Sequence, residues 1–214
     1  MRPTLVQLSV AEPAPAWEAL GFAVAGDSTR IGTVEVSFAP SETIPAPSGS
    51  GLVGWALTGL AGTGTVDVDG LETTLVEPPP AVAPAQHLNG ALSIDHVVVM
   101  TPDLSRTLDR LAETGLELRR TRDAGERMQA FYRVGEAILE VVGPHQPDGD
   151  GPARLWGFVC TVEDLDATGA LLGPALGPSG DAVQPGRRIA TVTRAAGIGV
   201  PLAFMSPDRP RNRP

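Results

Sequence analysis

The chain has 214 residues, of which 42% are hydrophobic and 19% charged, a composition typical of a globular protein large enough to bury a core. A formal net charge of −9 disfavours nucleic-acid binding, because contacts with phosphate need a basic surface. No apolar run approaches the roughly 20 residues of a membrane span, and no basic amphipathic stretch suits a membrane surface. All 16 basic residues are arginine, which suggests a G+C-rich bacterial genome. The single cysteine excludes an internal disulfide, and with no signal-peptide pattern the cytoplasm is the expected location.

The sharpest change of composition is the proline-rich stretch EPPPAVAPAQ. Proline holds the backbone extended and removes hydrogen-bond donors, so we predict a stiff linker over residues 78–89. This linker would separate an N-terminal α+β region, residues 1–77, from a domain over residues 90–207. Residues 208–214 are expected to form a tail.

The first unit after the linker begins with an apolar, β-branched strand, SIDHVVVM, at 93–100. A helix follows, with Thr101 as its expected N-cap, a proline in its first turn, a leucine stripe and an end near Gly115. Three more strands are then predicted, at 116–122, 128–134 and 137–143. The unit therefore has the order β-α-β-β-β.

The same order then begins again. GFVCTV (157–162) predicts a buried strand, and a helix is expected from Glu163 through Leu172. Strands are predicted at 187–194 and 200–206, after a proline- and glycine-rich stretch in which a further strand could lie. An internal repeat of this kind indicates two similar modules, which must pair to close a cup.

The N-terminal region shows a fainter version of this order. LVQLSV (5–10) resembles the first strand, and PAPAWEALGF resembles a short helix. Aligning Val10 with Val99 puts Gln7 at the position of His96. The region fits a shortened copy of the same module, or another α+β arrangement of short strands, which are predicted at 31–39, 52–60, 65–70 and 71–77.

The segments IDHVVVMTPDL, AILEVVGP and WGFVCTVEDLDATGALLG carry a family resemblance. In order and spacing, residues 92–207 resemble the vicinal oxygen chelate superfamily, which includes glyoxalases, bleomycin-resistance proteins and extradiol dioxygenases. The resemblance implies an α+β fold of paired βαβββ modules forming a curved, cup-like mixed sheet. It also implies four ligand positions for a divalent metal, one on the first and one on the last strand of each module.

Only half of that metal site is expected here. The resemblance places His96 and Glu140 at the two ligand positions of the first module, where they would be both metal ligands and catalytic residues. A nitrogen and a carboxylate ligand suit iron, manganese, nickel or zinc. The equivalent positions of the second module are Gly157 and Ala203, neither of which can bind a metal.

Other interpretations of this pair stay open. Strand alternation puts Ile94, His96 and Val98 on one face, so His96 could line a cavity without any metal. A carboxylate among aliphatic residues needs a partner, which for Glu140 could be His96 or an arginine such as Arg133. The His–Glu pair could also act as a general base without metal. Missing ligands could come from the N-terminal region or from another subunit, and formation of a homodimer stays open.

Three further residues are predicted to contact the substrate: Tyr132, Trp156 and Arg188. Arg187 and Arg188 are neighbours on a predicted strand, so one of them can reach the cup and bind an anionic group. His87, beside the linker, is expected to be exposed. Two functions compete: metal-dependent lyase, isomerase or dioxygenase chemistry, and non-catalytic binding of a small molecule for resistance or sequestration. A third possibility is a structural or oligomerising protein whose cup is filled by its own side chains.

Overall fold

The computed structural model describes residues 2–39 and 51–208. Over these ranges the strands form two mixed sheets, one of seven and one of eight strands, and the α-helices are few and short. The expected α+β class is therefore confirmed. None of the helices in the described ranges has the length and apolar character needed to cross a membrane.

The seven-stranded sheet contains all the strands that precede the proline-rich stretch. Its elements are β1 (Thr4–Val10), α1 (Ala14–Glu18), β2 (Val24–Ala25), β3 (Ser28–Ile31), β4 (Val34–Phe38), β5 (Leu52–Thr58), β6 (Gly64–Val68) and β7 (Leu71–Leu75). The strand order is β2-β3-β4-β1-β5-β7-β6, with β1 and β5 antiparallel at the centre.

The eight-stranded sheet contains all the later strands. Its elements are β8 (Ala91–Met100), α2 (Leu104–Glu113), β9 (Leu118–Asp123), β10 (Arg127–Val134), β11 (Ala137–Pro144), β12 (Arg154–Val162), α3 (Leu165–Leu172), β13 (Gly180–Asp181), β14 (Arg188–Thr191) and β15 (Leu202–Met205). The order is β13-β14-β15-β12-β8-β11-β10-β9, so each of the two modules contributes four strands. Its centre is again an antiparallel pair, β8 and β12.

Three local predictions are wrong. The strand expected at 31–39 starts only at Val34 (β4), because Ile31 ends β3 and the chain turns at Gly32, whose φ of 61° favours glycine. The strand expected at 187–194 is shorter, since β14 ends at Thr191. The N-cap of α2 is Asp103, whose side chain accepts a hydrogen bond from the Arg106 N–H, while the Thr101 hydroxyl accepts one from the Asp103 N–H.

The central strand pairs of the two sheets have irregularities at the same places. In β8 the residue Asp95 lies between the paired residues Ile94 and His96 and has no partner of its own on β12. In β1 the residue Val6 is skipped in the same way between Leu5 and Gln7. An extra residue of this kind is a β-bulge, which changes the direction of the side chains around it.

The second pair of bulges fixes the correspondence residue by residue. Trp156 of β12 has no partner on β8, and Val53 of β5 has none on β1. Each of these unpaired residues directly precedes a glycine of its strand. When the two ladders are superposed, Gln7 of β1 occupies the position that His96 has in β8, as the sequence predicts. By the same registers the other three ligand positions, Glu140, Gly157 and Ala203, correspond to Ser37, Gly54 and Thr74.

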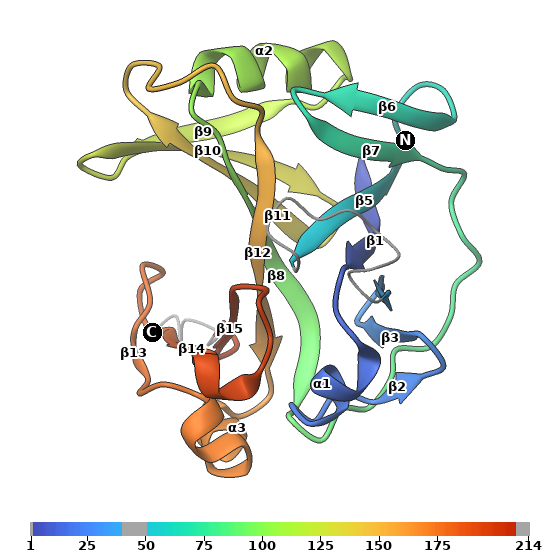
Figure 1. The fold of residues 1–214 in the computed structure, drawn as a ribbon, viewed down its shortest axis with the longest axis vertical. Helices are drawn as coiled ribbons and strands as arrows, with labels where there is room; N and C mark the ends of the chain where they lie inside the picture. The colour runs from blue at the N-terminus through green and yellow to red at the C-terminus, as the bar shows by residue number, and fades with distance from the viewer. Residues whose placement is uncertain (1, 40–50, 209–214) are drawn as a thin grey trace, which may run out of the picture.

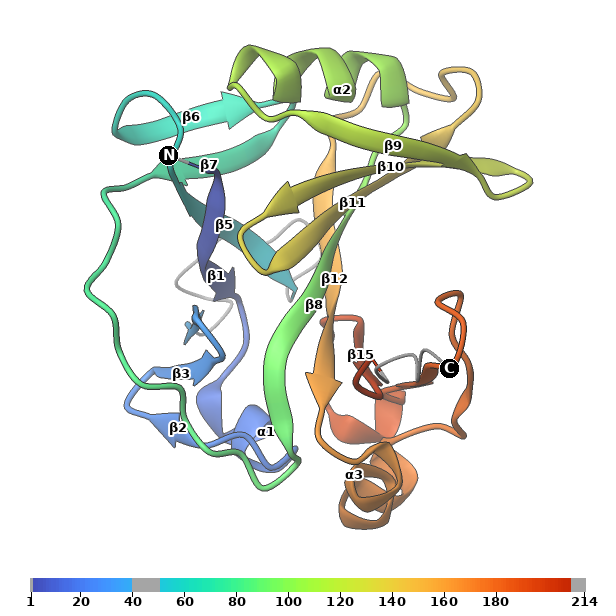
Figure 2. The same ribbon diagram turned by 180° about the vertical axis from the view of Figure 1, so that it is seen from behind.

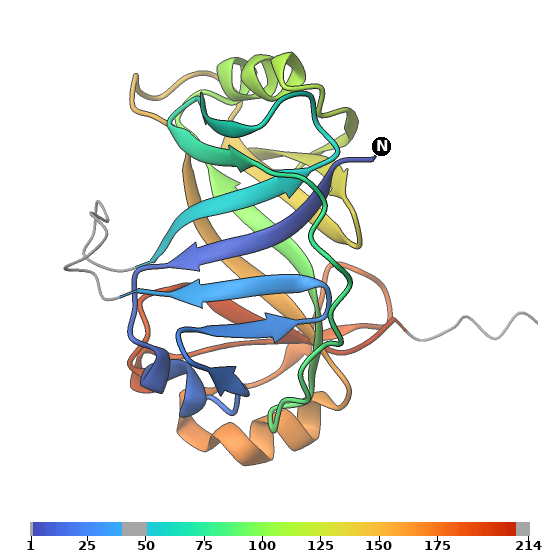
Figure 3. The same cartoon turned by 90° about the vertical axis from the view of Figure 1, so that its right-hand side faces the viewer.

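The two sheets pack face to face over one hydrophobic core, as Figures 1 and 3 show. Helix α2 lies at one end of this sandwich, and α1 and α3 lie at the other (Figures 1 and 2). The Trp17 ring of α1 stacks on Phe158 of β12, with ring centroids 5.9 Å apart. The outer strands of the eight-stranded sheet, β9–β11 and β13–β15, extend away from the seven-stranded sheet and leave a concave face between them (Figure 1).

Candidate functional site

The concave face of the eight-stranded sheet holds a hollow of about 300 Å³, referred to below as the cup. Its lining comes from β8, β11, β12, β14, β15 and the residue before β15. His96 and Glu140 are its ionisable residues, and the remaining lining residues are Val98, Met100, Val142, Trp156, Phe158, Val159, Ile189, Thr191, Pro201, Leu202 and Ala203. An apolar hollow with a few converging polar groups is the usual form of a small-molecule site.

The structure brings the two predicted site residues together. His96 Nε2 lies 3.7 Å from Glu140 Oε2, and both side chains are mostly buried. This separation is too long for a hydrogen bond but short enough for one ligand atom to contact both groups. Burial raises the pKa of Glu140, while the charges of His96 and Arg122 lower it by less.

The other face of the imidazole is held by a residue that alternation does not predict. His96 Nδ1 lies 3.0 Å from Asp95 Oδ2, although the two residues are neighbours on one strand. The bulge at Asp95 makes this contact geometrically available, because it breaks the alternation of β8. For the same reason Ile94 is buried in the core and does not share the face of His96 and Val98, contrary to the prediction.

Asp95 in turn is held by a nearly buried arginine. Arg187 Nη1 donates to Asp95 Oδ1 at 2.6 Å, Nη2 donates to the Thr161 hydroxyl at 3.1 Å, and Nε donates to the Ser206 carbonyl at 2.8 Å. Burial alone would raise the pKa of Asp95, but the hydrogen bonds from His96 and Arg187 and the charge of Arg187 lower it to about 2. The result is a chain of contacts, Glu140–His96–Asp95–Arg187, that begins in the cup.

The predicted substrate contacts are only partly brought to the cup. Trp156 lines it and is 44% exposed. Tyr132 lies in the hydrophobic core instead, because it faces the same side of the sheet as Leu139. Arg188 lies outside the cup, where its guanidinium donates to Asp166 at 2.9 Å.

The prediction for His87 is wrong. It is buried, and its Nδ1 accepts a hydrogen bond from the Ala23 N–H at 3.0 Å, which ties the proline-rich stretch to the seven-stranded sheet. A larger hollow of about 770 Å³ beside α2 contains the Asp69–Arg106 ion pair, which ties the turn between β6 and β7 to α2.

The comparisons with known proteins agree with this architecture. The model of the Glyoxalase/Bleomycin resistance protein/Dioxygenase superfamily matches residues 93–174. This segment is a glyoxalase-superfamily segment. It covers the first βαβββ module and the start of the second, up to the end of α3. No curated protein matches the chain.

Solved structures with the same fold extend over the whole chain. A mutant 4-hydroxymandelate synthase from Streptomyces coelicolor is 13% identical, with a TM-score of 0.61, over 100% of this chain and 95% of that one. A xylose isomerase-like TIM barrel/4-hydroxyphenylpyruvate dioxygenase fusion protein is also 13% identical, with a TM-score of 0.67, over 100% of this chain and 50% of that one. Methylmalonyl-CoA epimerase from Mycobacterium tuberculosis is 17% identical, with a TM-score of 0.45, over 61% and 95% of the two chains. The first two show that both sheets together form a known fold.

The residues of this chain do not fit the four-ligand metal site that the glyoxalase superfamily implies. A side chain at Gly157 has no room, because its Cβ would lie 2.1 Å from the Pro201 carbonyl oxygen. Ala203 offers only a methyl group. Among the described residues no group of three or more histidine, cysteine, aspartate or glutamate side chains is placed to hold a metal. His96 and Glu140 thus remain as two donors without the other half of the site.

Proposed function

We propose that the cup binds a small carbonyl compound and that Glu140 and His96 transfer a proton to and from the carbon beside its carbonyl group. The reaction belongs to the isomerase or lyase type and uses the protein's own acid and base. The ligand's apolar part contacts the aliphatic and aromatic walls, and its carbonyl end faces the His96–Glu140 pair.

The observation that supports this proposal is the His96–Glu140 pair, which holds the ionisable groups that line an otherwise largely apolar cup. The Glu140 carboxylate accepts the proton from carbon, and the electron pair of the broken C–H bond forms the enolate. The Asp95 carboxylate accepts the Nδ1–H of His96, so the unprotonated Nε2 faces Glu140. Nε2 can take the proton that Glu140 removed and return it to the enolate, which restores both groups. Apolar walls favour the proton transfer, since they keep water from competing for these groups.

Hydrogen–deuterium exchange of a neutral probe tests this. Propiophenone in D₂O should lose its proton signal beside the carbonyl faster with the protein present, measured by NMR. Glu140→Gln should slow this exchange by roughly 100-fold, because the general base is removed. His96→Ala should slow it as well. Glu136→Gln is the matched control, because it removes an exposed carboxylate from the same hairpin and should leave the rate unchanged.

Two outcomes would contradict metal-free proton transfer by Glu140 and His96. Quenching of Trp156 fluorescence by propiophenone without any exchange would favour the non-catalytic binding protein. Exchange that vanishes with a chelator and returns with iron, manganese, nickel or zinc would favour the metal-dependent enzyme. The cytoplasmic location, the bacterial source and the homodimer stay predictions, as do the boundaries of the two domains.

A further inference from the structure

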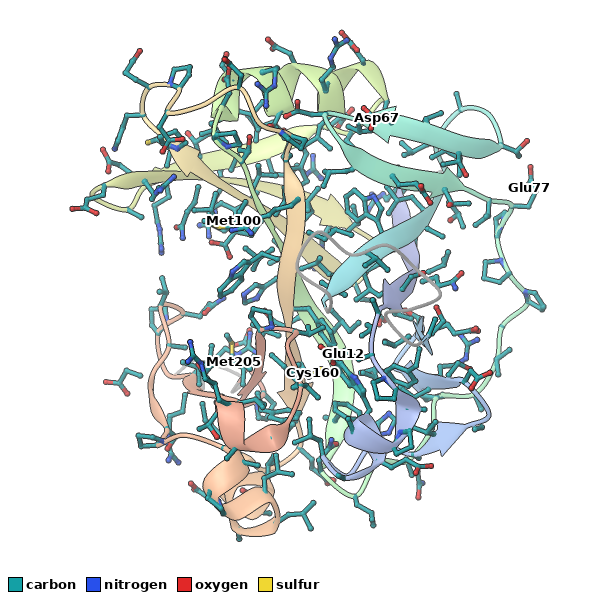
Figure 4. The ribbon with its side chains drawn as sticks, viewed as in Figure 1. Glu12, Asp67, Glu77, Met100, Cys160 and Met205 are labelled. Carbon is teal, nitrogen blue, oxygen red and sulfur yellow. The ribbon has the colours of Figure 1, made fainter. Side chains whose placement is uncertain are left out.

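One row of side chains crosses five strands of the eight-stranded sheet at the Met100 end of the cup. Arg122 on β9 is paired with Gln129 on β10, which is paired with Val142 on β11. Val142 is paired with Met100 on β8, and Met100 with Arg154 on β12. Directly paired residues share a face of the sheet, and Met100 and Val142 line the cup. The row therefore continues the cup on both sides, with Met100, labelled in Figure 4, near its middle.

The row ends in two arginines, Arg122 and Arg154, whose charges are not paired with a carboxylate of the described residues. Within residues 2–39 and 51–208, neither Arg122 nor Arg154 has an ion-pair partner or a side-chain hydrogen bond. The neighbouring Arg120 is engaged differently, with its guanidinium 4.7 Å above the Phe131 ring. In a protein with a net charge of −9, two unpaired guanidinium groups beside an apolar hollow form a local anion-attracting region.

Gln129, between Arg122 and the cup, provides a second observation. Its Oε1 is buried and has no hydrogen-bond partner among the described residues. A buried acceptor without a donor is costly, and such groups mark places where an interaction is completed by something else. The guanidinium of Arg122, its cross-strand neighbour, can donate to this oxygen while its other N–H groups bind an anion.

We propose that this row, from Arg122 to Arg154, binds the carboxylate of the ligand whose carbonyl end is held by His96 and Glu140. The substrate class is therefore a small keto acid with an apolar body. The carboxylate lies at the Met100 end. Glu140 is paired with Val98, and Val142 is paired with Met100 two residues further along both strands, so the row is the next one on the same face of the sheet. This inference rests on the proposed function and specifies its ligand.

Two matched probes test the inference. The first is 4-oxo-4-phenylbutanoate, and the second is its neutral amide, which has the same ring and ketone. We expect the exchange catalysed by the protein to be at least roughly tenfold more efficient for the carboxylate, in kcat/KM, and this preference to fall as salt is added. Arg122→Gln and Arg154→Gln should each reduce the preference several-fold, and the double variant should remove it. The readout is the ratio of the two rates, carboxylate over amide, because Arg122 also lowers the pKa of Glu140 and its loss changes the rate with both probes.

The control variant is Arg119→Gln, which removes the same charge from β9 but lines a separate hollow with Arg133. It should keep the preference for the carboxylate. If both probes exchange through Glu140 at equal rates in the wild-type protein, the inference is overturned while the proposed function stands. If neither probe binds nor exchanges, the proposed function fails and the inference fails with it.

Discussion

Asp95 occupies the place in β8 where the ladder skips a residue, and this irregularity gives His96 its second contact. In a regular strand, neighbouring side chains point to opposite faces and could not meet. The bulge lets the Asp95 carboxylate reach Nδ1 of His96 while Arg187 holds its other oxygen. The orientation of the imidazole in the cup therefore depends on a residue that does not line the cup itself.

The low pKa of Asp95 predicts an acid-dependent loss of stability. The pKa falls from 3.8 to about 2 in the folded protein, so Asp95 stabilises the fold above pH 3.8 and this contribution is lost as the pH falls toward 2. It corresponds to about 2 kcal/mol. Asp95→Asn should lack this part of the pH dependence in urea unfolding measured from about pH 5 to pH 2. The exposed Asp27→Asn should retain it, and an unchanged acid dependence in Asp95→Asn would refute the assignment.

The family resemblance places His96 and Glu140 at ligand positions, and each is also a polar residue within an apolar strand. The sequence does not predict that Asp95 and Arg187 hold His96, since the alternation of apolar and polar residues does not reveal the bulge at Asp95. The same limit applies to the arginines: Arg187 and Arg188 are adjacent, and only the path of the chain before β14 decides that Arg187 reaches Asp95. Arg122 and Gln129 are found only from the strand register.

At the level of elements, the order of strands and helices after the proline-rich stretch follows from hydrophobic pattern and repeat. Element ends are less predictable, because local caps and glycine turns compete with the pattern, as at Asp103 and Gly32. The weakest strand, β13, has only two residues and lies in the proline- and glycine-rich stretch. The pairing of strands, which no local pattern contains, is what shows that the N-terminal half repeats the C-terminal half.

Gly157 and Gly54 occupy equivalent positions in the two sheets, but we predict that substitution by alanine changes the free energy of unfolding differently at each. At Gly157 an added Cβ would lie 2.1 Å from the Pro201 carbonyl oxygen and 2.9 Å from the Pro201 Cβ, so β12 and the chain before β15 would have to separate. We expect Gly157→Ala to lower the free energy of unfolding by about 2 kcal/mol or more. At Gly54 the nearest atom would be the Ser9 Cβ at 3.8 Å, an ordinary contact.

Gly54→Ala is therefore the matched control for Gly157→Ala. It should be neutral or stabilise by up to about 1 kcal/mol, because alanine restricts the unfolded chain more than glycine does. Urea unfolding of the two variants checks both values. Equal losses of stability at the two positions would show that Pro201 does not pack against Gly157 in solution.

At the scale of the whole molecule, the two sheets are joined by polar as well as apolar contacts. Glu12, after β1, lies where the two sheets meet (Figure 4). Its Oε1 accepts hydrogen bonds from the Gly199 N–H at 2.6 Å and the Val200 N–H at 2.8 Å, and its Oε2 accepts one from Trp17 Nε1 at 3.1 Å. The proline-rich stretch predicts two separate units, whereas these contacts and one shared hydrophobic core link the two sheets directly. A contact between residues 187 positions apart is beyond any local pattern.

These contacts predict that removing one carboxylate at the junction affects both sheets. Glu12→Ala leaves three N–H groups without an acceptor, two of them in buried hydrogen bonds, and we expect it to lower the free energy of unfolding by about 2–4 kcal/mol. Native-state hydrogen exchange should then show lower protection in the slowest amides of both β1 and β12, because the sheets share one core. The exposed Glu18→Ala on α1 should change neither. If Glu12→Ala loosened only the seven-stranded sheet and left β12 fully protected, the two sheets would be independent folding units.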